Sequence, residues 1–491
     1  MNKKDLISRR RFLGSAATVV TGVTILPSNV IAGLGHKPPS DKLNIAGIGF
    51  GGKGYSNLRF METENIVALC DVDFDYAKNV FDRWHSAKAY MDYRIMFEQQ
   101  KDIDAVMIAT PDHSHALPAL LAMRQGLHAF VQKPLTHSIY ESRILGDTAR
   151  RYRVATQMGN QGNSDEGIRQ ICEWIWAGVI GEVIHVDTWT NRPIWPQGLQ
   201  RPEKGKRVPR DLDWDLFIGP AKWREYNPVY HPWNWRGWWD FGTGALGDMG
   251  CHILDPVFKA LMLEYPGSVE ASSTPANTES PPDAEVIRYE FPRRDNLPKV
   301  AMPPVTVNWY DGGIMPPRPK ELIDGEKMGD ESGGCIFYGT NGKIMCGTYA
   351  QNPTLLPTEQ MNNFVPPAKK LRRIANAMNG GHEQDWIRAC KENPETRLEA
   401  SANFNYSSPL NEMVLLGVLA VRLQSLNRKL YWDGPNMRFT NIGANDMLEI
   451  LNGENSAAKN QQFENNLISA PALKMAEEWI RHTYRQGWEQ I

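Results

Sequence analysis

The sequence predicts an α/β protein in which an N-terminal doubly wound parallel sheet is followed by an α+β domain with an open, mainly antiparallel sheet. A chain of 491 residues is too long for one compact core, so two domains are expected. Short apolar strands alternate with helices in the first third, which is typical of a parallel sheet. Further along, strand-like runs alternate in polarity between dense turn residues. We place the domains at 40–158 and 159–455, followed by a tail at 456–491 that we expect only to pack in an oligomer.

Composition narrows the class of protein. The net charge is -2 and the basic residues form no stripe, so we expect no nucleic-acid partner. The six cysteines form no C-x-x-C pair and have no zinc-site spacing, so we interpret them as buried thiols and expect no metal site.

The amino terminus has the order of an export signal. Basic residues precede a short apolar stretch at 12–27, and small residues follow at 30–32. The stretch is shorter than the roughly 20 residues that a spanning helix needs. The run from Ser8 to Gly14, SRRRFLG, matches the twin-arginine pattern. We therefore predict a signal peptide over 1–32, export to the periplasm and no stable membrane insertion after cleavage.

The first strand runs into glycines. The segment LNIAGIGFGGKG contains G-x-G-x-x-G at Gly47, Gly49 and Gly52. In such a motif the first glycine permits a tight turn, the second lets the backbone approach a pyrophosphate, and the third allows close packing of helix on strand. The anion would lie at the N-terminus of the following helix. This segment predicts a Rossmann-type dinucleotide site.

A second buried strand, IVALCD, ends in Asp71. An acid about 20 residues after the glycines can accept both ribose hydroxyls and repels a 2′-phosphate, which favours NAD over NADP. The alternative is an ordinary helix N-cap.

Two more strands complete the predicted parallel sheet, at 105–110 and 128–131. Ligands bind at the carboxyl ends of such strands, so four side chains are placed near a nicotinamide. They are Thr110, His113, Gln132 and Lys133.

The second domain is built from strand-like runs and one long irregular stretch, 191–236, rich in Pro and Trp. Long loops of this kind are usually functional. The predicted strands are Val183–Trp189, Val269–Ser273, Ala284–Phe291, Val305–Tyr310 and Gly334–Tyr338.

The segment GTGALGDMGCHILD, 242–255, predicts a helix with Asp248 and His252 one turn apart on one face. The carboxylate would orient the imidazole and keep it basic. Gly250 costs about 1 kcal/mol relative to alanine in a helix and fits a backbone that leaves room for a ligand. The alternative is a buried histidine with satisfied hydrogen bonds.

Four segments in this order, GIGFGG, TPDHSHA, QKP and GDMGCHILD, resemble the Gfo/Idh/MocA oxidoreductase family over roughly residues 40–450. The third motif of the family is usually Glu-Lys-Pro, and Gln132 replaces the glutamate here. The resemblance implies a Rossmann domain, a C-terminal sheet that mediates oligomerisation, and Lys133, Asp248 and His252 as the catalytic residues.

The chemistry expected from these residues is hydride transfer from a secondary alcohol. His252 is the candidate base and Asp248 its partner, while Lys133 stabilises developing alkoxide. Clustered tryptophans suit the faces of sugar rings, and we expect one or two to line the site and the others to be core. The candidate substrate-binding residues are Asn160, Gln161, Trp233, Trp235, Arg236 and His382. Asn160 and Gln161 follow an expected strand in VATQMGNQG, and His382 begins an expected helix.

We therefore predict an exported, homo-oligomeric NAD-dependent oxidoreductase acting on a sugar, glycoside or polyol with a tightly held cofactor. The first alternative is a glycosidase on the same scaffold, which transiently oxidises a ring hydroxyl and breaks the glycosidic bond by elimination. The second is a non-catalytic NAD- or sugar-binding protein.

Overall fold

A computed structural model describes residues 41–294, 297–454 and 466–489. The chain divides into units at residues 1–42 and 43–491, and the fold below belongs to the second. The predicted signal peptide, 1–32, lies outside the described residues.

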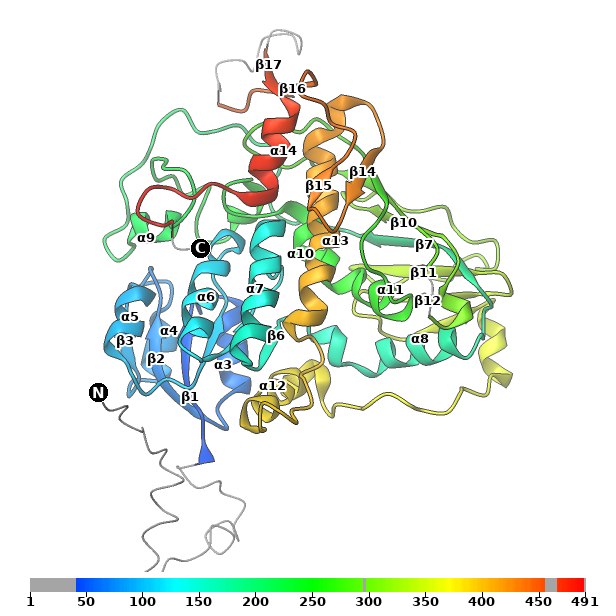
Figure 1. The fold of residues 1–491 in the computed structure, drawn as a ribbon, viewed down its shortest axis with the longest axis horizontal. Coiled ribbons are helices and arrows are strands. Elements are labelled where there is room, and N and C mark those ends of the chain that lie inside the picture. Colours follow the sequence, from blue (N-terminus) through cyan, green and yellow to red (C-terminus); the bar gives the residue numbers. More distant parts are fainter. Residues whose placement is uncertain (1–40, 295–296, 455–465, 490–491) are drawn as a thin grey trace, which may run out of the picture. The chain divides into compact units, whose positions relative to one another are not determined.

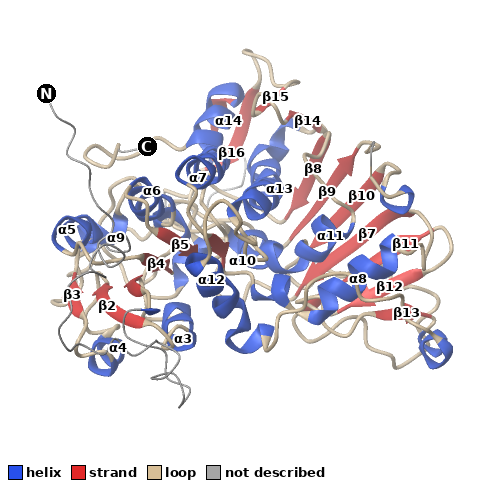
Figure 2. Cartoon of the chain, turned by 60° about the horizontal axis from the view of Figure 1, so that its bottom comes forward, coloured by secondary structure: helices blue, strands red, loops and turns tan. Residues whose placement is uncertain are grey.

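The predicted doubly wound parallel sheet is confirmed. It has six strands in the order β3-β2-β1-β4-β5-β6, and all its paired strands are parallel. Helices cover both faces (Figure 2). The strands are β1 (Asn44–Ile48), β2 (Asn65–Cys70), β3 (Lys88–Tyr90), β4 (Ala105–Ile108), β5 (His128–Val131) and β6 (Thr156–Met158). The helices are α3 (Lys53–Phe60), α4 (Lys78–Arg83), α5 (Tyr93–Gln99), α6 (Ala116–Arg124) and α7 (Ile139–Tyr152).

The sequence analysis missed the edge strand β3. Only Tyr90 of its residues is buried, so the strand has no apolar run to reveal it. It pairs with β2, the strand that Asp71 follows, and forms one edge of the sheet.

The second sheet is open and mainly antiparallel, as predicted. Its order is β13-β12-β11-β7-β10-β9-β8-β14-β15, and β7 and β10 are its parallel pair. Each strand predicted for this domain is present to within a residue or so at either end. The strands are β7 (Val183–Thr190), β8 (Ser268–Ser273), β9 (Glu285–Phe291), β10 (Val305–Tyr310), β11 (Gly333–Gly339), β12 (Lys343–Cys346), β13 (Thr354–Leu356), β14 (Leu430–Asp433) and β15 (Arg438–Phe439). A separate hairpin pairs β16 (Met447–Leu451) with β17 (Leu467–Pro471).

One long helix joins the two sheets. α13 (Phe404–Leu423) packs on α7 (Figure 1) and also on β8 and β9 (Figure 2). α12 (His382–Lys391) covers the parallel sheet, and its Trp386 Nε1 donates a hydrogen bond to Ala155 O. The other helices of this part are α8 (Glu166–Trp176), α9 (Trp214–Ile218), α10 (Gly244–Ile253), α11 (Asp255–Ala260) and α14 (Ala472–Arg481). α14 packs on α13 and α7 of the same chain, so the described part of the tail belongs to this fold.

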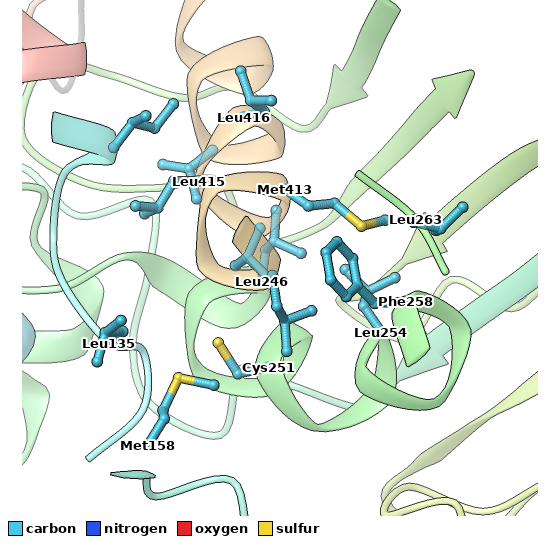
Figure 3. Close-up of a cluster of buried hydrophobic side chains, with 14 of the residues drawn as sticks. Leu135, Met158, Leu246, Cys251, Leu254, Phe258, Leu263, Met413, Leu415 and Leu416 are labelled. Carbon is cyan, nitrogen blue, oxygen red and sulfur yellow. The ribbon is translucent and has the colours of Figure 1, made fainter. Parts of the chain in front are cut away.

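The helices α10 and α13 share a buried apolar core (Figure 3). A Cβ on Gly250 would lie 3.0 Å from a methyl carbon of Val414. This corrects the expectation for Gly250, because the glycine lets two helices pack closely rather than making room for a ligand. The six cysteines are buried free thiols, as predicted.

A buried amide ties α13 to the loop that follows β5. The N–H of Leu135 donates to Asn411 Oδ1 at 3.0 Å, and Asn411 Nδ2 donates to Thr136 Oγ1 at 3.0 Å. Asn411 is fully buried, so these groups have no access to water.

Replacing Asn411 with leucine should lower the free energy of unfolding by about 1–3 kcal/mol, because it strands buried donors and acceptors. Denaturant unfolding of the purified protein measures this loss. The control is Asn405→Ala on the exposed start of the same helix, expected within about 0.5 kcal/mol of wild type. Equal losses in the two variants would contradict the role of the buried amide.

Candidate active site

The turn after β1 shows which glycines the fold requires. Gly49 has φ +75°, and a Cβ there would lie 2.7 Å from the backbone nitrogen of Thr110. A Cβ on Gly54, in the first turn of α3, would lie 2.3 Å from the carbonyl oxygen of Gly49. Gly51, between them, lies against the ring of Tyr76. The tight turn therefore requires a glycine at position 49, and the close packing of the helix requires one at position 54.

The glycine motif predicted from the sequence, which begins at Gly47, therefore begins two residues too early. The G-x-G-x-x-G frame that meets the structural demands is Gly49, Gly51 and Gly54. Gly47 lies inside β1, and its neighbours are the side chains of Leu58 and Leu69. Gly52 precedes α3 as its N-cap, and a Cβ there would meet only one atom, at 3.9 Å.

Asp71 follows β2 and is tied to this turn. Its carboxylate accepts the N–H of Phe50 at 3.0 Å and that of Asp73 at 3.1 Å. Burial raises the pKa of Asp71 to about 6, although both hydrogen bonds act to lower it. The first helix after Asp71, α4, begins only at Lys78, so Asp71 is not its N-cap.

A cleft runs from the glycine turn to α10 and brings most of the predicted residues together. The predicted residues that line it are Gly49, Gly52, Asp71, Thr110, Gln132, Lys133, Gln161, Trp233, Trp235, Arg236, Asp248 and His252. Lining residues that the sequence analysis did not select include Asp112, Arg192, Tyr349 and Trp488.

Three predicted side chains lie behind the cleft wall instead. The ring nitrogens of His113 are 3.0 and 3.2 Å from carbonyl oxygens of Phe217 and Phe241, and burial lowers the pKa of His113 to about 3. His113 therefore joins backbone segments rather than contacting a cofactor.

His382 and Asn160 are likewise fully buried and structural. His382 starts α12 as predicted, but its nitrogens bond Met158 O at 2.8 Å and Ser164 Oγ at 2.7 Å. Asn160 donates to Asp255 at 2.8 Å. Both side chains therefore support the wall of the cleft and do not line it, contrary to the prediction that they bind substrate.

Lys133 and Asp248 form the central contact of the cleft. Lys133 Nζ donates to Asp248 Oδ1 and to the carbonyl oxygen of Asp248, each at 2.7 Å. Arg236 Nε lies 3.4 Å from the same carboxylate oxygen. Burial opposes ionisation of Asp248, but the two cations outweigh it and lower its pKa to about 2.

His252 differs from the expectation that Asp248 keeps it basic. The Asp248 carboxylate bonds Lys133 instead, and His252 Nδ1 has no hydrogen-bond partner among the described residues. Burial and then the charge of Lys133 lower the pKa of His252 well below 6.5. His252 is therefore a neutral imidazole, able to accept a proton. The ring of Tyr349 contacts it edge to face, with centroids 4.8 Å apart.

The tryptophans divide as expected between the site and the core. The guanidinium carbon of Arg236 lies 4.3 Å from the ring centroid of Trp233 and 4.2 Å from that of Trp235. Both rings line the cleft, whereas Trp238 and Trp239 are buried. Arg236 is thus stacked between aromatic faces beside Asp248.

Two of the unpredicted lining residues are Asp112, which lies inside the TPDHSHA segment, and Tyr349, which belongs to none of the four motifs. Asp112 accepts a hydrogen bond from Thr243 Oγ1 at 2.7 Å, and burial raises its pKa to about 7. Tyr349 stands next to Ala350, which has φ +62°, a conformation that is uncommon outside glycine. The bond between Asp112 and Thr243 spans 131 residues, and the backbone conformation beside Tyr349 is not encoded in residue type, so neither could be read from the sequence.

The cleft fits a dinucleotide with a reacting alcohol at one end. Its glycine turn leaves no room for a Cβ at Gly49, and Asp71 offers a carboxylate to ribose hydroxyls. At the other end, Thr110 Oγ1 and His252 Nδ1 are buried polar atoms without a partner in the described residues. Such atoms are usually satisfied by a ligand or water. Gln132, beside them, donates to Asn57 Oδ1 at 2.9 Å.

The described residues include no cluster of three or more His, Cys, Asp or Glu side chains that could hold a metal ion.

Comparison with known proteins finds two domain models of one family along this chain. Residues 43–160 match the family model "Oxidoreductase family, NAD-binding Rossmann fold". Residues 176–291 match "Oxidoreductase family, C-terminal alpha/beta domain". Both carry the name of the Gfo/Idh/MocA family.

Among curated relatives, glycosyl hydrolase family 109 protein 2 of Akkermansia muciniphila is 34% identical over 207 residues. That match covers 38% of this chain and 44% of the relative, so it spans less than half of the relative's length.

Solved structures share the fold at low identity. The WlbA dehydrogenase of Bordetella pertussis, in complex with NADH and UDP-GlcNAcA, has a TM-score of 0.54 and 13% identity, covering 80% of this chain and 98% of that one. A levoglucosan dehydrogenase with NADH and L-sorbose has a TM-score of 0.54 and 16% identity, covering 79% and 98%.

The glycine turn, Asp71 and the Lys133–Asp248–His252 cluster occur in the same cleft, and both family models match in order along the chain. The protein is therefore an NAD-binding member of the Gfo/Idh/MocA oxidoreductase family.

Proposed function

We propose that the protein transfers a hydride between a secondary hydroxyl of a sugar or glycoside and a tightly held NAD. The observation that carries this proposal is the position of the Lys133 ammonium beside a neutral, unpartnered His252 in the dinucleotide cleft. One group can polarise the reacting oxygen and the other can take its proton.

Each residue of the site has a task in this reaction. When bound, NAD would accept the hydride, and its reduced form would donate it. His252, whose lowered pKa leaves it unprotonated, accepts the hydroxyl proton as the hydride leaves. Lys133 hydrogen-bonds the same oxygen and stabilises its developing negative charge, while Asp248 holds Lys133 in place.

The aromatic wall favours a sugar as substrate. Trp233 and Trp235 present ring faces that suit the C–H faces of a pyranose, and Arg236 between them offers donors to hydroxyl groups. The names of two structural neighbours, a levoglucosan dehydrogenase and an enzyme solved with UDP-GlcNAcA, add support for a carbohydrate.

The second candidate is an NAD-dependent glycosidase. It is favoured by the Akkermansia relative, which is named as a glycosyl hydrolase. The same side chains would assist oxidation of a ring hydroxyl by bound NAD, the adjacent C–H would become acidic, and the glycosidic bond would break by elimination. Addition of water and return of the hydride would then complete the hydrolysis. The two functions differ in their net products rather than in their folds.

Export through the twin-arginine route and a homo-oligomeric state stay predictions. The signal at 1–32 falls outside the described residues, and no helix within the described ranges has the length and apolar character to span a bilayer. The twin-arginine route would carry the folded protein with its cytoplasmic cofactor already enclosed.

Products formed from a panel of glycosides distinguish the two enzymatic candidates. We expect NAD-loaded protein with a keto-sugar acceptor to yield a keto-glycoside, detected by mass spectrometry as a loss of two hydrogens. Release of free sugar without an acceptor would instead establish the glycosidase.

Replacing His252 with alanine should lower turnover by about 10²–10⁴-fold, because the hydroxyl proton loses its acceptor. The NAD content of the purified protein should stay unchanged. His185→Ala, on β7 and outside the lining of the cleft, is the matched control. Full activity of the His252 variant would remove its assignment as the base.

Affinity for NAD should increase as pH rises through about 6, since ionised Asp71 accepts the ribose hydroxyls better than its acid form. Below that pKa, affinity should fall by up to about tenfold per pH unit. Fluorescence titration of NAD into cofactor-free protein measures this slope. Asp71→Asn should abolish the slope and Asp75→Asn, at an exposed neighbouring position, should keep it. A slope that survives in Asp71→Asn would contradict this role.

A further inference from the structure

The segment that follows α14 crosses from the helices of the second half to the parallel sheet. Figure 1 shows it in red, running from α14 toward α9. The carbonyl oxygen of Arg481 accepts a hydrogen bond from Ser138 Oγ at 3.4 Å, and the Tyr484 hydroxyl bonds the carboxylate of Glu141. Residues 482–489, called here the C-terminal segment, therefore begin beside the N-terminal end of α7, a helix of the cofactor half.

Arg485 anchors this segment beside α9. Its Nη1 donates to Asp215 Oδ1 at 2.6 Å, and its Nε donates to the carbonyl oxygen of Gly219 at 3.1 Å. The backbone N–H of Arg485 donates to Pro220 O at 3.0 Å. The anchor uses an ion pair and backbone bonds together, so the segment is held in one place.

The anchor places Trp488 in the wall of the cleft. Trp488 is buried, with 5% of its surface exposed, and it lines the cleft together with Met91 and Asp92. The guanidinium carbon of Arg94 lies 4.3 Å from its ring centroid, and the ring of Tyr93 lies 6.4 Å away. Arg94 is in turn held by the Asp92 carboxylate at 2.7 Å.

Strand order shows which part of the dinucleotide this wall covers. Asp71, at the end of β2, is the residue that takes the adenosine ribose. Met91, Asp92 and Tyr93 follow β3, which is the neighbour of β2 on the side away from β1. Trp488 therefore stands at the adenosine end of the cleft, far along the sheet order from Lys133, which follows β5.

We propose that the C-terminal segment is the outer wall of the adenosine site, and that Trp488 controls how fast NAD leaves. The indole supplies an apolar face at the adenine end, in contact with residues that follow β3. Release of the dinucleotide requires Trp488 to leave its place against Arg94, and the Arg485 anchor opposes that movement. This role concerns cofactor retention and is independent of which sugar reaction the protein performs.

Exchange of bound NAD against isotopically labelled NAD tests this directly. NAD-loaded full-length protein is mixed with excess labelled NAD. At intervals the protein is separated from free NAD by gel filtration, and mass spectrometry measures the labelled fraction of the bound cofactor. The Trp488→Ala variant should exchange its bound NAD at least about tenfold faster than wild type, because an aromatic contact is lost from the site. Trp488→Phe keeps a ring and should restore most of the slow exchange.

Trp223→Ala is the matched control. Trp223 is 59% exposed, lies near Arg485 and does not line the cleft, so its removal should leave the exchange rate unchanged. Arg485→Gln keeps the Trp488 side chain but removes the ion pair of the anchor and the guanidinium that lies 5.9 Å from the indole ring centroid. It should speed exchange in the same direction, and it carries the test if Trp488→Ala fails to fold. Equal exchange rates for Trp488→Ala and Trp223→Ala, or rapid exchange in wild type, would overturn the proposal.

Discussion

The site depends on the ion pair between Lys133 and Asp248. Lys133 belongs to the loop after the fifth strand of the parallel sheet, and Asp248 belongs to α10 beside the antiparallel sheet. Their 2.7 Å contact therefore brings the cofactor half and the substrate half to one point. Lys133 also affects His252: burial is the main cause of the lowered pKa of this imidazole, the charge of Lys133 adds to it, and that of Asp248 opposes it. A cation held by the ion pair and an imidazole kept neutral mainly by burial therefore lie in the same part of the cleft.

Sequence periodicity predicted much of the fold and part of the site. The alternation of strands and helices identified the parallel sheet, and the i, i+4 spacing of Asp248 and His252 placed both on α10. The glycine assignment failed for a physical reason. Several glycines follow one another after β1, and only the positive φ of Gly49 and the close approach at Gly54 show which frame the turn uses. Residue identity alone does not determine such dihedral angles and contacts.

Other features were out of reach because they depend on contacts between distant segments. Lys133 and Asp248 are 115 residues apart, so spacing alone paired Asp248 with His252 instead. Trp488 reaches the cleft only because α14 packs on α7 and directs the chain toward α9. His382 was correctly placed at a helix start, but its bonds to Met158 and Ser164 make it part of the wall.

A double-mutant cycle on the free energy of unfolding tests the central contact most directly, and it needs no substrate. The variants are Lys133→Met, Asp248→Asn and the two together. Breaking a largely buried ion pair leaves an uncompensated charge, whereas replacing both partners leaves none. The double variant should therefore lose less than the sum of the single losses, with a coupling of at least about 1 kcal/mol. Losses that simply add would show that the two residues do not act as a pair, and the account of the site would fail with them.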